Sequence, residues 1–389
     1  MFDIIISNFG FWFNIIIPVT FAAYLAFTHK DYVWEEFGMQ TAASVAYAGI
    51  MYSLLFSTTA DLMDREYWNG KVNQFNYYEE WTELVHYTEE ICTGTGNNRR
   101  CTTIPKTRHD YHSPYWEIKT SNGETLSINK HQYAKAEKEF GSIKEKLSRS
   151  GQISVGDGNL FYVQPTKIIP TSVAHSYINY VTAAKQTVIK KTVSEDTINM
   201  LVKNKKLRPY PIGYDGPYGN NLLDRVIDTT GTANVKKLLN ELDLISSKVG
   251  KSHQANPIIY ITDLDRTFVA ALEHYWNKAK KNDIVLVLGV DALGNIQWSD
   301  VIAWTNNSDF YIDINNSFKN MHVDNVTPLF SELIISGYKR KPMEEFSYLK
   351  ENITLEWYWQ FFIIIGNIII SFFITRAFLT NYHSNRFKR

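Results

Sequence analysis

The sequence predicts an α+β protein in which transmembrane helices anchor an extracytoplasmic part of mixed helix and strand. Three observations support this fold class: long runs without charge, a middle region with strand-like alternation, and two cysteines that flank a turn-rich segment. The 389 residues include 40 basic and 40 acidic side chains. Because the net charge is zero, the composition gives no electrostatic reason to expect a nucleic-acid partner.

The C-terminal run, predicted as a transmembrane helix over 353–376, is the strongest membrane signal. Residues 357–375 carry no charge, and about 20 apolar residues cross a bilayer as a helix. Aromatic residues typical of a membrane interface open the run: Trp357, Tyr358 and Trp359. Only basic charges follow it: Arg376, Arg386, Lys388 and Arg389. The positive-inside rule therefore predicts a basic cytoplasmic tail over 377–389.

Two further transmembrane helices are expected within residues 1–60. The run 4–28 is uncharged, and the one charge ahead of it is Asp3, so it lacks the basic start of a signal peptide. The run 38–60 is also uncharged but more polar, so a re-entrant or interfacial helix is its alternative. With either reading, the bulk of the chain lies outside the inner or plasma membrane.

Residues 61–208 are predicted to form a β-rich extracytoplasmic region. Cys92 and Cys101 enclose a segment of glycines and asparagines, which form turns, so we expect a hairpin tip with the two cysteines facing each other. In an oxidising compartment such a pair forms a structural disulfide. The alternative is a metal site that adds His109 and His112, although the spacings differ from those of zinc modules.

The rest of this region is predicted to hold another hairpin, a helix and further strands. Asn122-Gly123 separates two alternating runs, 116–120 and 125–128, which is a strong hairpin signal. A charged helix is expected over 130–148, weakened by its glycine, and strands over 151–170. The stretch 209–232, rich in Pro, Gly and Tyr, is predicted to be a linker between two domains.

Residues 233–350 change to a pattern of alternating helices and strands. Apolar spacing predicts helices over 235–249, 267–280 and 314–336. Short branched runs predict strands over 257–262, 283–290 and 296–304. That order implies an α/β domain of two or three layers around a small mixed sheet.

A helix that ends at Trp276, followed by Asn282-Asp283 and the strand 284–288, resembles the TPM domain, and the resemblance covers about 233–348. That family is a small α/β module, usually extracytoplasmic and tethered by a membrane helix. The resemblance implies divalent-ion binding by acidic loops, and phosphatase activity in some members. The comparable acids follow two predicted strands: Asp263, Asp265 and Asp291. The flanking stretches 66–70 and 339–346 resemble uncharacterised membrane proteins of large tailed phages.

No catalytic motif is present: the sequence lacks a nucleophile elbow, a phosphate-binding loop, a zinc-protease motif and a dinucleotide fingerprint. Catalytic residues therefore stay unassigned, and no cofactor is expected apart from a divalent cation at the three acids. Asn14 and Asn367 lie inside predicted spans, where buried amides find partners across helix interfaces. We expect these two residues to mediate packing, within one chain or between copies.

The first hypothesis is a non-enzymatic, membrane-anchored interaction or scaffolding protein of the cell envelope. Its expected partners are the lipid bilayer, other membrane or envelope proteins, and further copies of itself. If it is encoded by a phage, it would act on the host envelope. The alternatives are a membrane-tethered, metal-assisted phosphatase-like hydrolase and a structural membrane protein of the virion.

Overall fold

The computed structural model is an α+β protein, as predicted. It describes residues 5, 9–28, 34–59, 62–94, 96, 99–145, 147, 152–155, 158–184, 193–353 and 355–386. The chain divides into two compact units. Unit 1 comprises 1–65, 176–192 and 341–389, and unit 2 comprises 66–175 and 193–340.

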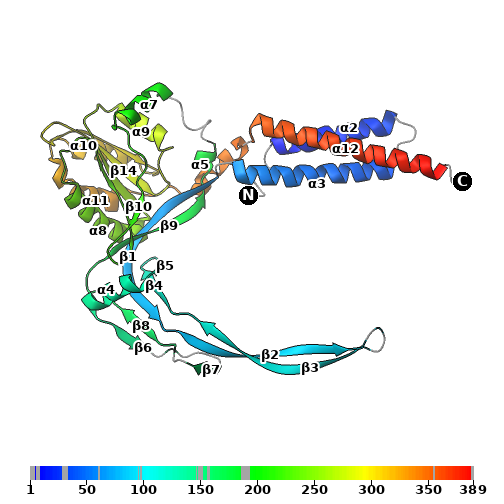
Figure 1. Ribbon diagram of the computed structural model, residues 1–389. Coiled ribbons are helices and arrows are strands. Elements are labelled where there is room, and N and C mark those ends of the chain that lie inside the picture. Colours follow the sequence, from blue (N-terminus) through cyan, green and yellow to red (C-terminus); the bar gives the residue numbers. More distant parts are fainter. Residues whose placement is uncertain are drawn as a thin grey trace. The chain divides into compact units, whose positions relative to one another are not determined.

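Unit 1 contains three long helices that run side by side (Figure 1). They are α2 (Phe9–Thr28), α3 (Trp34–Thr59) and α12 (Trp357–Arg386). Among the described residues of the same unit are two short helical elements, α5 (Tyr180–Ala183) and η3 (Met343–Asn352). α12 approaches α3 closely at Gly366, where a Cβ would overlap the hydroxyl of Tyr47.

Unit 2 contains most of a six-stranded sheet with the order β5-β4-β1-β8-β6, in which β9 also pairs with β1. The strands are β1 (Met63–Tyr78), β4 (Tyr115–Thr120), β5 (Thr125–Ile128), β6 (Ile143–Glu145), β8 (Leu160–Val163) and β9 (Pro170–Ile178). The predicted hairpin of β4 and β5 is confirmed. Helix α4 (Lys130–Phe140) packs Tyr133 and Ala136 onto the core around Phe75.

The predicted helix over 130–148 is wrong in its second half. α4 begins with a capping box at Asn129 and ends at Gly141, which has a φ of 77°. Glycine adopts this backbone conformation without the steric cost that other residues meet, so it ends the helix. The chain then forms β6, whose Ile143 pairs with Tyr162 of β8.

A second sheet has the order β3-β2-β7, formed by β2 (Trp81–Thr93), β3 (Arg100–His112) and β7 (Gln152–Val155). β2 and β3 are antiparallel and stay in one continuous register from Trp81↔His112 to Thr93↔Arg100. β7 pairs with β2 only over residues 82–84 of β2. The hairpin predicted around the cysteines is therefore confirmed, and it is longer than the sequence indicated.

The remainder of unit 2 is a three-layer α/β sandwich on a sheet with the order β12-β13-β14-β15. β12 (Val226–Asp228), β13 (Asn256–Thr262) and β14 (Asp283–Val290) are parallel, and β15 (Ile296–Ala303) is antiparallel to β14. Helices cover both faces, so β13 and β14 are buried along their whole length. A mixed sheet of this kind is what the sequence predicted.

Alternate residues of the central strands enter two separate cores. Ile259 and Leu286 face a core built with α8 (Val235–His253), α10 (Ser308–Ser317) and α11 (Thr327–Gly337). Tyr260 and Val287 face the opposite core, built with α7 (Glu195–Lys203) and α9 (Phe268–Tyr275). This division follows from the period of two along a strand.

The single helix predicted over 314–336 is wrong, because α10 and α11 are separate helices with the 3₁₀ turn η2 (Val323–Asn325) between them. Asn320 has a φ of 67°, which breaks helical geometry, and α11 starts afresh with proline in its first turn. The stretch 209–232 contains the small hairpin of β10 (Gly213–Asp215) and β11 (Asn221–Leu223), followed by β12.

Candidate functional site

The β2–β3 hairpin is exposed over most of its length. Residues 86–91 of β2 and 100–109 of β3 are all exposed to solvent. Figure 1 shows the two strands as a long twisted ribbon. A two-stranded ribbon with both faces in water gains little from burial and is marginally stable by itself. A ribbon of this length therefore needs a stabilising feature of its own, and its exposed faces are available for contact with other molecules.

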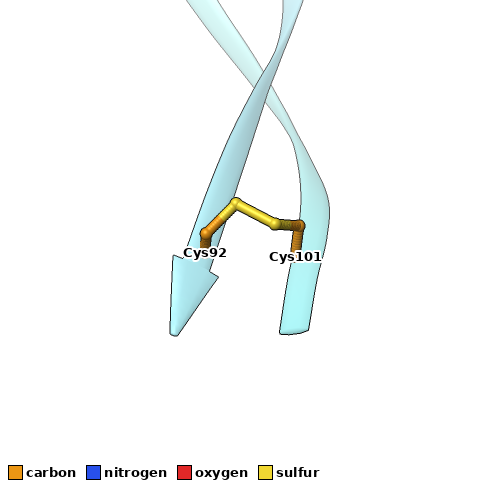
Figure 2. The surroundings of a disulfide bond; sticks show 2 residues. All are labelled: Cys92 and Cys101. Atoms are coloured by element: carbon orange, nitrogen blue, oxygen red, sulfur yellow. A yellow bond between two sulfur atoms is a disulfide. The ribbon is translucent and has the colours of Figure 1, made fainter. Parts of the chain in front are cut away.

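The stabilising feature is a disulfide between Cys92 and Cys101, directly opposite each other near the tip (Figure 2). The bond closes a loop with a sequence separation of nine residues. Closing a loop of this size lowers the conformational entropy of the unfolded chain, which stabilises the folded state by about 2–3 kcal/mol. The predicted pairing of the two cysteines is thus confirmed, and their sulfurs are not free thiolates that could bind a metal.

Three exposed apolar side chains share one face of the ribbon, whereas Tyr111, which is 64% exposed and pairs with Thr82, lies on the other face. Residues that pair across the ribbon share a face, and faces alternate along each strand. Tyr87, Ile91 and Ile104 fall on the same face and are 41%, 42% and 40% exposed. Lys106 forms an ion pair with Glu89 between them, and Arg108 lies over the Tyr87 ring at 5.9 Å. We call Tyr87, Ile91 and Ile104 the apolar face.

The opposite face holds the disulfide and several threonines, among them Thr88, which pairs with Pro105. His109 lies on this face, whereas His112 lies on the apolar side, because the two positions are an odd number, three, apart along one strand. His112 stacks on Trp81 at 4.1 Å and faces Glu83 at 3.3 Å. The two histidines therefore both lie on β3, and they do not converge with the cysteines on one face.

The apolar face was not predicted, although a signal for it was present in the sequence. Once Cys92 and Cys101 are paired, counting outward along both strands gives every cross-strand pair, including Tyr87↔Lys106. The sequence did not reveal that no other helix or strand would cover most of this long hairpin. Burial of a strand face depends on other elements of the chain, which local alternation does not report.

Among the described residues, one helix is long and apolar enough to cross a membrane: α12, over Trp357–Ile374. A core helix of a soluble protein would be mostly covered, yet only 17% of this window is buried. The outward residues are large and apolar, with Trp357 75%, Phe362 59% and Phe373 61% exposed. A shorter apolar stretch, Gly10–Phe21, lies in α2.

Polar side chains lie inside the three-helix bundle while apolar ones cover its outside. Asn14 and Asn367 are fully buried, and Asn367 Nδ2 donates to the backbone carbonyl of Asn14 at 3.2 Å. Asn14 Nδ2 donates to the carbonyl of Gly10 at 2.7 Å. Ser44 and Ser371 are buried as well. The structure thus brings together the two amides that the sequence analysis selected, from helices at opposite ends of the chain.

The three acids considered for a metal site each have local partners. Lys206 Nζ donates to both carboxylate oxygens of Asp263, at 2.7 Å each. Asp265 accepts from the backbone N–H of Thr267 at 2.8 Å at the start of α9. Asp291 accepts from the backbone N–H groups of Leu293 and Asn295 at 2.9 and 2.8 Å, as a turn residue does.

Hydrogen bonds to these carboxylates lower the pKa of each. In the part of the chain that the structure describes, the group of three potential ligands within 4.8 Å of one another is Glu90, Cys92 and Cys101, and its two sulfurs form the disulfide. The three aspartates do not form such a group. Their contacts are an ion pair for Asp263, a hydrogen bond to the backbone two residues later, just before α9, for Asp265, and a turn for Asp291.

No protein-family model matches this chain, and no curated protein or solved structure is detectably similar to it. The resemblance to the TPM domain stays a prediction. Functional conclusions therefore depend on the residues of this chain alone.

Proposed function

We propose that this protein is anchored in the membrane of a cell envelope and acts by binding another protein through its β2–β3 hairpin. The observation that carries the proposal is the apolar face of Tyr87, Ile91 and Ile104 on an exposed, disulfide-closed ribbon. The function is one of interaction or scaffolding rather than catalysis. The contacts of the three aspartates give the hydrolase alternative no support.

The membrane anchor is supported by the distribution of side chains in the three helices. A water-soluble bundle buries apolar residues and exposes polar ones. Here Ile16, Ile50 and Phe362 are 54%, 60% and 59% exposed, whereas Asn14 and Asn367 are fully buried. Lipid favours this arrangement, because it solvates apolar side chains and leaves amides to find partners inside. We propose that α2 and α3 span the membrane together with α12.

The hairpin is proposed to lie outside the cytoplasm. Arg376 is exposed on α12 after its apolar stretch, and further basic residues follow it in the sequence. The positive-inside rule favours a cytoplasmic location for this end. The disulfide supports the same orientation, since disulfides persist in oxidising compartments and are rare in the cytosol.

Protein binding is the use that best fits the ribbon. Exposed apolar residues lose contact with water when a partner covers them, which is favourable, and the ion pair of Lys106 and Glu89 between them adds specificity. β3 also has an outer edge that pairs with no strand among the described residues, so its N–H and C=O groups are open to strand addition. The disulfide holds the ribbon in shape before binding, which reduces the entropy lost on association.

The test places a photo-cross-linking amino acid at Tyr87 in the full chain, expressed in its membrane, and compares it with the same substitution at Thr88. The two positions are adjacent in sequence but lie on opposite faces. We expect a discrete cross-linked product from position 87 and none from position 88. Ile91→Asp should remove the product, because it places a charge on the apolar face.

The matched control is Thr103→Asp, which adds the same charge on the opposite face. It should leave the product intact. Equal cross-linking from both faces, or equal loss with both aspartates, would show that the apolar face binds nothing specifically. Protease treatment of intact cells checks the orientation independently, because a hairpin in the cytoplasm would be protected.

A further inference from the structure

Unit 2 carries a strongly basic surface on two segments that are far apart in the sequence. The segment 197–212 includes four basic residues and no acid, and the segment 274–282 includes three lysines and no acid. The chain as a whole has no net charge, so this concentration is local. We call these seven side chains the basic patch: Lys203, Lys205, Lys206, Arg208, Lys278, Lys280 and Lys281.

The two segments lie side by side in the folded chain. Trp276 Nε1 donates to the backbone carbonyl of Arg208 at 2.9 Å. Lys280 Nζ lies over the ring of Tyr210, 5.3 Å from its centroid. Each of these contacts joins one segment to the other, so the charges of both occupy one region of the surface.

The backbone of both segments adopts a conformation that residues other than glycine rarely take. The φ angle is 57° at Lys205, and it is 49°, 66° and 59° at the consecutive residues Asn277, Lys278 and Ala279. In the described part of the chain, four of the six non-glycine residues with positive φ thus belong to these two segments. Such residues persist only where the surrounding contacts enforce them, and they are concentrated at sites that bind ligands. Trp304 supplies one of these contacts, because its Nε1 donates to the carbonyl of Lys278 at 2.9 Å.

Acidic neighbours balance only part of the charge of the basic patch. The side chains of Lys203, Lys205 and Arg208 are exposed and form no ion pair with any residue that the structure describes. Clustered like charges repel one another, and an approaching anion relieves this repulsion. Three other lysines of the patch do have acidic partners: Lys206 with Asp263 at 2.7 Å, Lys278 with Glu273 at 3.9 Å and Lys281 with Glu66 at 3.2 Å.

Exposed apolar side chains accompany the charges without acidic partners. Met200 and Val202 of α7 are 54% and 38% exposed, whereas Ile198 of the same helix is buried in the core. Residues three positions apart share a face of a helix, so Met200 lies beside Lys203. The backbone N–H of Lys205 donates to the carbonyl of Val202 at 3.0 Å, which keeps this residue beside the patch as well.

Lysines next to exposed apolar side chains match the chemistry of a membrane surface. Lipid phosphates attract the lysines, and the apolar side chains enter the boundary between headgroups and acyl chains. A lysine carries a compact charge on a flexible stem, which suits phosphates that are not held in one geometry. We propose that the basic patch, together with Met200 and Val202, binds an anionic lipid surface. This surface is separate from the hairpin, and its binding does not depend on what the hairpin binds.

The test uses the full chain with Met200→Cys, labelled with a fluorophore that responds to the polarity of its surroundings. Cys92 and Cys101 are the two cysteines of the sequence and are joined to each other, so the label reacts at one site. The labelled protein is held in nanodiscs of phosphatidylcholine, and vesicles with or without phosphatidylglycerol are added. We expect a blue shift with phosphatidylglycerol and none with phosphatidylcholine alone. The shift should disappear at about 1 M salt, which screens the attraction.

Neutralising the exposed charges should weaken the affinity for anionic vesicles roughly a hundredfold, since each basic residue near such a surface adds to the attraction. This variant combines Lys203→Gln, Lys205→Gln and Arg208→Gln. The matched control removes three exposed charges from α8, which packs on the opposite face of the sheet: Lys236→Gln, Lys248→Gln and Lys251→Gln. It should leave the affinity unchanged, and cross-linking from position 87 should persist in both variants.

The proposal is overturned if vesicles with and without phosphatidylglycerol give the same response, or if the two triple variants act alike. It is equally overturned if polyglutamate shifts the fluorescence as strongly as anionic vesicles of the same total charge. That result would identify an acidic protein as the partner of the basic patch.

Discussion

Arg225 and Asp243 form an ion pair that is almost closed to solvent: Arg225 Nε donates to Asp243 Oδ1 at 3.1 Å, and the two side chains are 1% and 9% exposed. The guanidinium also donates to side-chain oxygens on other strands of unit 2, those of Asn69, Ser172 and Asn256. One cation therefore joins β1, β9, α8 and β13. Burying a charge costs free energy unless the charged group is paired and hydrogen-bonded. The hydrogen bonds of the Arg225 guanidinium meet this need and hold several elements together.

Arg225→Met is expected to destabilise the protein by about 3–5 kcal/mol, because it leaves Asp243 buried without its partner. The measurement is thermal unfolding of the full chain in detergent micelles, followed by tryptophan fluorescence. Arg266→Met is the matched control, since Arg266 pairs with Asp300 at 2.8 Å but is 51% exposed. Exposed pairs contribute about 0–1 kcal/mol. Similar unfolding temperatures for the two variants would show that the buried network does not stabilise unit 2.

Asp283 gives the stability of unit 2 a dependence on pH. Burial raises the pKa of its carboxyl to about 6, and it outweighs hydrogen bonds that favour the ionised form, from Asn256, Lys280 and Tyr210. An unfolded aspartate titrates near pH 3.9, or about two units lower. Because the folded pKa is the higher one, protonation favours the folded state. The stabilisation is complete below about pH 4 and is lost as the pH rises to about 6, a change of about 2–3 kcal/mol.

Asp283→Asn should therefore flatten the profile of stability between pH 4 and pH 7, measured as the unfolding temperature at several pH values. Asp265→Asn serves as the control. Hydrogen bonds from Thr267 lower the pKa of Asp265, so this exposed group loses its stabilising effect only at more acidic pH. Its substitution should leave the profile between pH 4 and pH 7 unchanged. A wild-type profile without a fall in this range would contradict the role given to Asp283.

The elements that sequence reasoning identified are those whose signal is local. The strand β14 is a run of branched residues with both faces buried, and the β2–β3 hairpin is announced by glycines and asparagines between two cysteines. β12 was missed because its three residues, Val226–Asp228, are too short to show a period. They become a strand by pairing with β13, whose residues lie some thirty positions later.

The candidate sites also divide into those with a local sequence signal and those that only the folded chain brings together. Cys92 and Cys101 are nine residues apart, so the turn between them reveals the pair. Asn14 and Asn367 could be selected only because an amide is unusual in an apolar run; that they touch depends on how three helices pack. The small cleft lined by Trp68, Asn122, Gly250 and Asn282 draws on segments far apart in the sequence and has no local signature.

The contact between α12 and α3 at Gly366 gives the sharpest test of the three-helix bundle. A Cβ at this position would overlap the Tyr47 hydroxyl, so Gly366→Ala forces the tyrosine ring to move. Inserting an atom into a packed interface costs typically about 1–3 kcal/mol. SDS titration of the full chain in mixed micelles, followed by tryptophan fluorescence, should show an earlier transition.

Gly49→Ala is the matched control within the same bundle, because a Cβ on Gly49 meets nothing within 4 Å. This substitution should leave the transition in place or shift it slightly later, since alanine favours helix over glycine. The double variant Gly366→Ala with Tyr47→Ala separates steric overlap from a general effect of the new methyl group. If overlap is the cause, the two changes are not additive, and alanine at 366 costs less once the tyrosine ring is gone. Additive losses would mean that α12 and α3 do not meet at Gly366.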